Sequence, residues 1–327
     1  MRRRAALLAP AAVLAAPAVA RAQAAWPNRQ PIRLVAGFPA GGLADAIGRL
    51  VAAPLGEALG GTSVVVENRT GASGTLGADL VAKAAPDGLT LAVSHAIPFG
   101  FAPGVLPGLP YDPVADFTHL GLLAEAPTVV VVRGNSPHAS LPALIEASRR
   151  APVRYGSSGV GSAEHVMGAV IAAEARAPDL DHVPYRGTAP ALGDLLARQI
   201  DALNAPITTL AGQLRDGTLR ALATSTERRL AAFPDVPTLA ELGFGAATFT
   251  QWIGLSGPRG LPAPVAERLT AALPPILARA EVRARLADFV SEPRTPTPTG
   301  PDFARFVAAF RDEWVGKTRA LGIAASS

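Results

Sequence analysis

The 327-residue sequence contains no cysteine. This absence excludes disulfide bonds, thiolate nucleophiles and zinc sites built from cysteine. It leaves the cellular compartment open, because a protein of this size has a core large enough to fold without disulfides. Long apolar runs are also missing after residue 22. The mature product is therefore predicted to be soluble.

Lysine is almost absent, since Lys83 and Lys317 are the only residues of this type. The 30 basic residues are nearly all arginines, and four of them lie in residues 1–22, so that 26 basic residues balance 26 acidic residues in the rest of the chain. After residue 22 the longest basic runs are the pairs Arg149-Arg150 and Arg228-Arg229. The sequence therefore indicates no basic patch, and we do not expect a nucleic-acid partner.

Residues 1–22 have the composition of an export signal. Arg2, Arg3 and Arg4 form a positive start, residues 5–20 are apolar, and Ala20-Arg21-Ala22 has the small-x-small spacing of a cleavage site. We predict a cleaved signal peptide and a periplasmic location. An uncleaved N-terminal anchor is the alternative, and the arginines leave both the Sec and the Tat export routes open.

Short apolar runs alternate with helical patterns along the mature sequence, which is typical of an α/β protein with parallel strands. Strands are expected at 32–36, 63–66, 89–93, 128–132, 153–157, 182–184, 199–203 and 219–224. Helices are expected at 47–59, 76–84, 141–150, 162–175, 188–198, 263–280 and 302–320. In the last helix one apolar face is predicted to consist of Phe303, Phe306, Val307, Phe310 and Trp314.

These elements fall into two α/β units, and the mature length suits two lobes. We predict that residues 23–126 and 229–327 form a discontinuous first lobe and that residues 127–228 form the second. The strands near 128–132 and 219–224 are expected to carry the chain from one lobe to the other and back. The segment 234–249 is rich in turns.

The segment from Gly37 to Asp45 follows a strand and opens a helix. Backbone N–H groups at a helix start have no intrahelical partner and attract anions, and glycines let a ligand approach the backbone. The pattern is neither G-x-G-x-x-G nor a P-loop, so it does not imply a nucleotide. The alternative is a plain turn in which Asp45 caps the helix.

Two further segments, 155–165 and 182–190, have the same strand–turn–helix arrangement. The first is rich in small hydroxyl residues that suit a carboxylate, and it does not fit the G-x-S-x-G spacing of a serine hydrolase. His165 is interpreted as a packing or capping residue. In the second, Tyr185 offers a hydroxyl and Arg186 offers a guanidinium that either pairs with an acid or lies in solvent.

Ligands of open α/β sheets bind outside the carboxyl ends of the strands. Both halves of the chain place glycine- or hydroxyl-rich helix starts at such ends. Two lobes that face each other would therefore form a cleft lined by backbone donors.

Six ordered motifs cover essentially the whole mature chain and resemble one family. They are Phe38-Pro39-x-Gly41-Gly42-x-x-Asp45, Val65-Val66-Glu67-Asn68-Arg69-x-Gly71-Ala72-x-Gly74, Pro86-Asp87-Gly88-Leu89-Thr90-Leu91, Leu109-Pro110-Tyr111-Asp112-Pro113, Val183-Pro184-Tyr185-Arg186-Gly187 and Pro234-Asp235-Val236-Pro237-Thr238. The sequence resembles the substrate-binding proteins of tripartite tricarboxylate transporters, also called Bug receptors.

The resemblance implies a periplasmic binding protein fold, in which two α/β lobes close on a ligand cleft. It also implies a monomer without cofactor or metal that binds a small carboxylate through backbone and hydroxyl donors, partly through water, and then docks on the membrane subunits of a transporter. The implied ligand-binding positions are Phe38, Ala40, Gly41 and Ser94 in the first lobe, and Ser157, Gly161, Ser162, His165, Tyr185, Gly187 and Thr188 in the second.

The sequence departs from the family pattern at three positions. Gly37 and Ala40 stand where prolines are common, which predicts a softer loop or a wider pocket. Asn204 stands where the family usually has Asp, a position that faces the cleft in acid-binding members. We include Asn204 among the predicted ligand-binding residues, and its lack of charge argues against an amino-acid ligand. From the sequence alone, Asn204 is either a ligand donor or a cap of the following helix.

The leading prediction is thus a receptor with no catalytic activity. A carboxylate sensor that reports to a membrane signalling system is one alternative, and a periplasmic hydrolase that uses the same cleft is another. A hydrolase needs a nucleophile–base pair or a metal cluster. The five histidines, His95, His119, His138, His165 and His182, are scattered in the sequence and do not form such a pattern.

Overall fold

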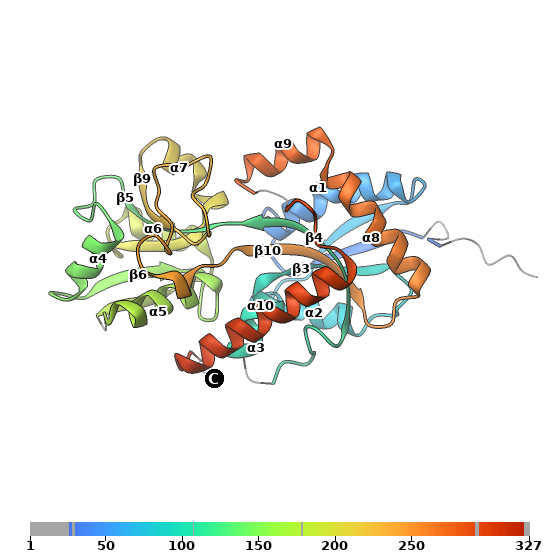
Figure 1. Cartoon of the computed structure of the whole chain (residues 1–327), viewed down its shortest axis with the longest axis horizontal. Coiled ribbons are helices and arrows are strands. Elements are labelled where there is room, and N and C mark those ends of the chain that lie inside the picture. Colours follow the sequence, from blue (N-terminus) through green and yellow to red (C-terminus); the bar gives the residue numbers. More distant parts are fainter. Residues whose placement is uncertain (1–25, 28–29, 107, 178, 292–293, 324–327) are drawn as a thin grey trace, which may run out of the picture.

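The computed structural model describes residues 26–27, 30–106, 108–177, 179–291 and 294–323. Its strands form two five-stranded sheets, one in each of two lobes that lie side by side along the molecule (Figure 1). The predicted export signal, residues 1–22, lies outside the described residues.

The first sheet has the strand order β2-β1-β3-β10-β4 and the second has the order β7-β6-β8-β5-β9. The strands of the first sheet are β1 (Ile32–Ala36), β2 (Val64–Asn68), β3 (Thr90–His95), β4 (Phe117–Ala126) and β10 (Gln251–Pro258). Those of the second are β5 (Thr128–Arg133), β6 (Val153–Ser157), β7 (Leu180–Pro184), β8 (Ala202–Pro206) and β9 (Leu219–Thr224).

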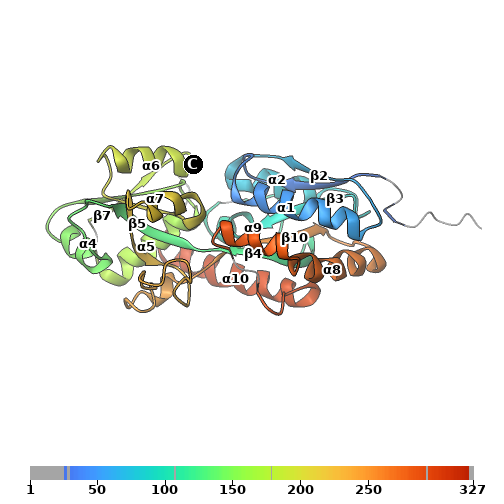
Figure 2. The ribbon, with the colours of Figure 1, turned by 90° about the horizontal axis from the view of Figure 1, so that it is seen from above.

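Helices cover both faces of each sheet. Those of the first lobe are α1 (Leu43–Ala58), α2 (Thr75–Ala82), α3 (Ala102–Val105), α8 (Ala263–Leu277), α9 (Ala280–Asp288) and α10 (Gly300–Ala320). Those of the second lobe are α4 (Leu141–Ser148), α5 (Ala163–Ala175), α6 (Thr188–Leu196) and α7 (Ala211–Arg215), as seen from above in Figure 2. Among the described residues, no helix is both long enough and apolar enough to cross a bilayer.

The predicted strand–helix alternation is confirmed, and the bounds of β1, β6 and β9 agree with those expected. The prediction of parallel strands is only partly correct, because both sheets are mixed. β10 runs antiparallel to β3 and β4, and β5 runs antiparallel to β8 and β9. These two strands follow crossings between the lobes, so they join their sheets without the helical crossover that a parallel pair requires.

Five of these strands and helices were not predicted: β4, β10, α3, α7 and α9. All eight residues of β10 are buried, so the strand has no polar–apolar alternation, and it contains Gly254 and Gly257. The expected helix 263–280 ends at Leu277, and the chain starts α9 three residues later.

The chain crosses between the lobes at two places. The outward crossing is Pro127 between β4 and β5, as predicted from strand 128–132. Strand β9, near which the return was predicted, pairs within the second sheet as β5 does, so it precedes the return and does not form it. The return is the segment before β10, where the Phe249 N–H donates to the Ser225 carbonyl and the Ser225 N–H donates to the Thr128 carbonyl. The lobe boundaries near residues 126 and 228 stay a prediction.

The apolar core continues from one lobe into the other. One buried cluster includes Val35 of the first sheet, Val130 of the second and Val166 of α5. α10 packs along β4 and α3 on this side (Figure 1) and supplies Phe303, Val307, Phe310 and Trp314, which confirms the predicted apolar face. Separate clusters lie under α1, α8 and α9 and under α6 and α7. The continuous core gives the two lobes a shared base.

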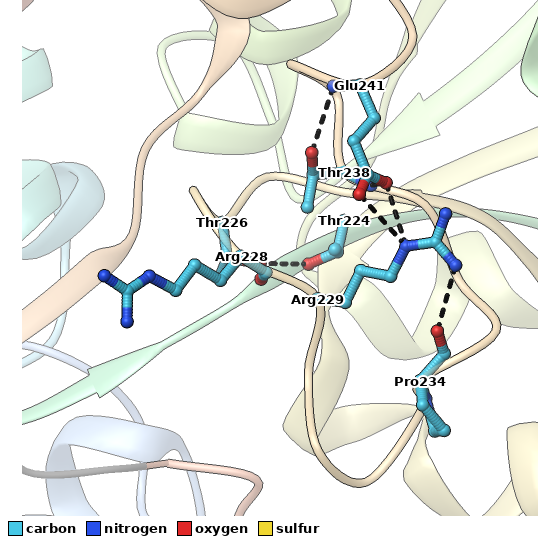
Figure 3. A network of polar contacts seen from close by, with 7 residues as sticks. All are labelled: Thr224, Thr226, Arg228, Arg229, Pro234, Thr238 and Glu241. Atoms are coloured by element: carbon cyan, nitrogen blue, oxygen red, sulfur yellow. Dashed lines mark hydrogen bonds and ion pairs between the residues drawn. The ribbon is translucent and has the colours of Figure 1, made fainter.

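The sixth sequence motif, which ends at Thr238, closes the edge of the second sheet (Figure 3). Thr238 forms a parallel bridge with Thr224 of β9. The Thr238 N–H donates to Glu241 and Thr238 Oγ accepts from the Glu241 N–H, while Arg229 donates to the same carboxylate and to the Pro234 carbonyl. The Thr238 N–H and then Arg229 lower the pKa of Glu241. The motif therefore has a structural role at this edge.

Candidate functional site

The carboxyl ends of the parallel strands in both sheets lie toward the crossing segments. In the first sheet, β10 begins beside the crossing at Gln251, and Ile253 pairs with His95 at the end of β3, which runs parallel to β1. In the second sheet, Thr128 at the start of β5 pairs with Pro206 at the end of β8, and β6 and β7 run parallel to β8. Both sets of carboxyl ends therefore face the boundary between the lobes.

A buried carboxylate holds the first loop from behind. Asp45 accepts hydrogen bonds from the Gly41 N–H and from Asn68 Nδ2, both at 2.9 Å, and Arg49 pairs with the same group. Burial opposes ionisation of Asp45, but the bonds from Arg49, Gly41 and Asn68 lower its pKa below the usual range. The Gly41 N–H is thus used to shape the loop, and a ligand would meet the N–H groups of the next residues instead.

Two glycines at the predicted site have a left-handed backbone and open space in front of them. Gly41 has φ +82° and Gly187 has φ +115°, and a Cβ on either would meet nothing within 4 Å. Gly37 packs closely against the neighbouring segment, because a Cβ there would lie 2.7 Å from the Gly74 carbonyl oxygen, and the predicted softer loop or wider pocket stays a prediction. Ala40 is exposed between these constrained positions.

The end of β3 contains Ser94, whose ligand contact stays a prediction, and His95, which lies beside the first loop. The Ser94 side chain is fully buried and its hydroxyl lies 3.0 Å from that of Ser256. Its neighbour His95 packs against Phe38, with the rings tilted by 51° and their centroids 4.7 Å apart. His95 Nδ1 accepts the Ile97 N–H, so Nε2 carries the proton of the neutral ring. Burial lowers the pKa of His95 to about 3.

The second loop is held by side chains of the first turn of α5. Ser162 caps the helix by accepting the His165 N–H at 3.2 Å. His165 Nδ1 accepts the Gly161 N–H at 3.1 Å, so the proton of the neutral ring is on Nε2. This Nε2–H has no hydrogen-bond acceptor among the described residues. Ser158 donates to Glu164 at 2.8 Å. The predicted capping role of His165 is consistent with this geometry.

Two of the histidines come together, although they are scattered in the sequence. The rings of His165 and His182 stack with centroids 3.9 Å apart, and His182 Nε2 lies 2.6 Å from Ser157 Oγ. Burial lowers the pKa of His165 to about 4 and, with the neighbouring His165, that of His182 to about 3. Among the described residues, no group of three or more His, Asp or Glu side chains is placed to hold a metal ion.

The third loop is held in the same way as the first two. The Tyr185 hydroxyl donates to Asp194 of α6 at 2.7 Å, and its contact with a ligand stays a prediction. Burial and this carboxylate raise the pKa of Tyr185 to about 12. Thr188 is the first residue of α6 and is half-buried, and Arg186 is exposed.

Asn204 links the central strand of the second sheet to α5. Its side chain is 3% exposed, and Nδ2 donates to the Glu164 carbonyl at 3.1 Å. Its amide therefore neither caps the following helix nor stands free at the edge of the sheet.

Replacing Asn204 by Asp is expected to lower the free energy of unfolding by about 1–3 kcal/mol at neutral pH. The substitution exchanges a buried donor for a charged acceptor that faces the Glu164 carbonyl. Urea unfolding of Asn204→Asp and of Asn204→Ala measures the effect, and the uncharged control should lose less. A variant that is as stable as the wild type and that now binds acidic amino acids would instead place Asn204 against the ligand.

One arrangement recurs in all three loops: a carboxylate on the following helix accepts a hydrogen bond from the loop. The carboxylates are Asp45, Glu164 and Asp194. Only Asp45 was singled out from the sequence, and an acid in the first turns of each helix was the available signal. Among the described residues, the groups left for a ligand are the remaining first-turn N–H groups of α1, α5 and α6, the His165 Nε2–H and the Thr188 hydroxyl.

Comparisons with known proteins identify relatives of this chain. Residues 47–320 match the family model described as the tripartite tricarboxylate transporter family receptor. The chain is 32% identical to the BugT protein of Bordetella pertussis over 91% of this chain and 90% of that protein. The malate-bound MatC structure of Rhodopseudomonas palustris has 32% identity and a TM-score of 0.78, over 88% of this chain and 98% of that one. The adipate-bound Rpa4515 structure of R. palustris has 30% identity and a TM-score of 0.82, over 92% and 100%.

Proposed function

Because this chain belongs to the tripartite tricarboxylate transporter receptor family, whose members are solute-binding receptors and not enzymes, we propose that it captures a small carboxylate between its lobes in the periplasm. The loaded receptor then delivers this ligand to the membrane subunits of a transporter. The predicted fold, a periplasmic binding protein with two α/β lobes, is shared with solved relatives of this family.

One observation carries the proposal. Three helices, α1, α5 and α6, begin at the carboxyl ends of the parallel strands, and these ends face each other across the boundary between the lobes. The first-turn N–H groups of α1, α5 and α6 attract negative charge. The three nearby carboxylates, Asp45, Glu164 and Asp194, already accept protein hydrogen bonds, which lowers the repulsion that a carboxylate ligand would meet. Solved relatives hold malate and adipate.

In this proposal, Phe38 and Ala40 form an apolar wall on the first lobe. The His165 Nε2–H and the Thr188 hydroxyl donate from the second lobe, and Gly41 and Gly187 let the ligand approach the backbone. Closure gains contacts that the open form lacks, so the ligand shifts the population toward the closed form. That closed form is the one proposed to dock on the membrane subunits.

The Ser157–His182 pair is the observation that bears on the hydrolase alternative. A serine 2.6 Å from a histidine nitrogen has the spacing of a nucleophile and its base. However, the Ser157 side chain is fully buried and its oxygen also accepts the Gly159 N–H. We therefore assign the pair a structural role in the second loop. The sensor alternative uses the same binding site.

A thermal-shift screen of residues 23–327 tests the proposal. The protein is first unfolded and refolded to remove any bound ligand and is then mixed with dicarboxylates, tricarboxylates, acidic amino acids and aromatic acids. A ligand at a hundred times its dissociation constant should stabilise the fold by roughly 2.7 kcal/mol.

His165→Ala is expected to reduce the shift, because it removes the Nε2–H donor of the second loop. Arg186→Ala is the matched control in the neighbouring loop and should change the shift little, since we assign no ligand contact to the exposed guanidinium. No shift with any carboxylate would overturn the proposed ligand class.

A further inference from the structure

Glu164 is a buried carboxylate that the proposed ligand contacts do not use. Its side chain is 1% exposed. Oε2 accepts from Ser158 Oγ at 2.8 Å and Oε1 accepts from Gln251 Nε2 at 2.7 Å, while its backbone carbonyl accepts from Asn204. Every one of these partners lies on a different element of the fold.

The partners connect the second loop to both crossing segments. Gln251 is the first residue of β10, and its Nε2 also donates to Thr128 Oγ1 at 3.2 Å. Thr128 is the first residue of β5. Ser158 lies in the loop between β6 and α5. A chain of three hydrogen bonds therefore runs from the loop through Glu164 to the two strands at which the lobes join.

Burying such a network lowers the stability of the fold unless every polar group in it has a hydrogen-bond partner. Removing water from a carboxylate is compensated here by two short hydrogen bonds from neutral donors. Losing one of them leaves one oxygen of the buried carboxylate without a partner. A complete buried network instead restricts the side chains to one arrangement. The Glu164–Gln251 bond thus fixes where the second loop stands relative to the start of β10.

We propose that Glu164 is a positioning residue, which holds the loop at residues 157–162 in register with the crossing strands and so couples lobe orientation to ligand affinity. The inference rests on the proposed function, because the affinity in question is that for a carboxylate between the lobes. Rotation of the lobes about residues 127 and 250 changes the geometry around Gln251, and through Glu164 it moves Ser158.

The test exchanges the amide and the carboxylate of the Gln251–Glu164 hydrogen bond. Gln251→Glu places two carboxylates at a distance suited to one hydrogen bond, and it should weaken binding of the malate or adipate probe at least tenfold. The double variant Glu164→Gln/Gln251→Glu restores an amide–carboxylate pair, with the new amide oxygen facing Ser158 and the Thr128 hydroxyl facing the new carboxylate. It should recover affinity to within about threefold of the wild type, given the usual non-additivity of residues in contact.

A second measurement reports the orientation of the lobes in the absence of ligand, as the distribution of distances between two spin labels. The absence of native cysteine permits spin labels at Leu76→Cys and Leu196→Cys, two exposed positions on the first and second lobes. Gln251→Glu should broaden the distance distribution and the double exchange should narrow it again. Glu146→Gln, which removes an exposed carboxylate of α4 in the same lobe, should change neither readout.

The outcomes separate the two proposals. If the wild type binds no carboxylate probe, the proposed ligand class fails, and the distance distributions still decide the positioning role. If Gln251→Glu keeps the wild-type distribution and affinity, the positioning role is wrong. If the folded double exchange stays as impaired as Gln251→Glu, Glu164 and Gln251 act separately and the inference is also overturned.

Discussion

Replacing Trp252 by alanine is expected to lower the free energy of unfolding by about 3–5 kcal/mol. The indole is fully buried in β10, and its ring centroid lies 6.1 Å from that of Phe99, 5.6 Å from that of Phe303 and 6.0 Å from that of Phe310. The cavity would open where the first sheet meets α10. Because both flanks are aromatic and interlocked, the site has little freedom to collapse.

Urea unfolding measures this loss through the midpoint, with an unchanged slope as the sign that only stability has changed. Trp252→Phe is the matched control. It keeps most of the ring volume and removes the indole N–H, which has no hydrogen-bond partner among the described residues, so its loss should be clearly smaller. A loss under about 1 kcal/mol for Trp252→Ala would show that the cluster rearranges to fill the space.

Acidification from pH 7 to pH 5.5 is expected to lower the free energy of unfolding by roughly 2–3 kcal/mol through two histidines, His95 and His119. Burial lowers the pKa of His95 to about 3 and that of His119 to about 4, from an ordinary value of 6.5. The unfolded chain therefore binds protons in this range that the folded chain does not. Stability is complete above about pH 6.5 and falls as the pH drops toward the folded values.

Thermal unfolding at a series of pH values checks this dependence. His119→Asn removes one of the two titrating groups and should reduce the loss of stability between pH 7 and pH 5.5 by about half. His165 and His182 act in the same direction, but solvent screens their partly exposed rings and their share is smaller. Equal stability at the two pH values would contradict the burial of neutral histidines.

The acid dependence also bears on the binding measurement. His165 and His182 are neutral at pH 7 because their pKa values are about 4 and about 3. A carboxylate ligand therefore meets an N–H dipole on His165 and not a cation. Ligand affinity should accordingly change little between pH 8 and pH 6, although stability begins to fall near the lower value.

Local order along the chain was determined by the sequence itself. Period-2 and period-3.6 patterns report which face of an element is buried, so β1, β6 and the apolar face of α10 followed from the residues alone. The three loops also followed, because glycines and small hydroxyl residues between a strand and a helix have few other uses. The six ordered motifs identified the family before any contact was known.

Contacts between distant segments were decided only by the tertiary structure. Gln251 and Glu164 are 87 residues apart, and no periodicity relates them. The stacking of His165 on His182 requires that α5 and β7 pack against β6 together. β10 lies antiparallel between β3 and β4, so the return between the lobes uses β10 and not β9.

The contrast between Ser94 and His95 shows the physical reason. Neighbours on a strand point to opposite faces of the sheet, and both residues are buried under helices, so composition does not tell which of the two faces the first loop. Local patterns depend on the free energy gained when the apolar side chains of one helix or strand leave water. The choice of face, the pairing of crossing strands and the partners of buried carboxylates depend on the packing of all elements at once, and only the assembled fold determines them.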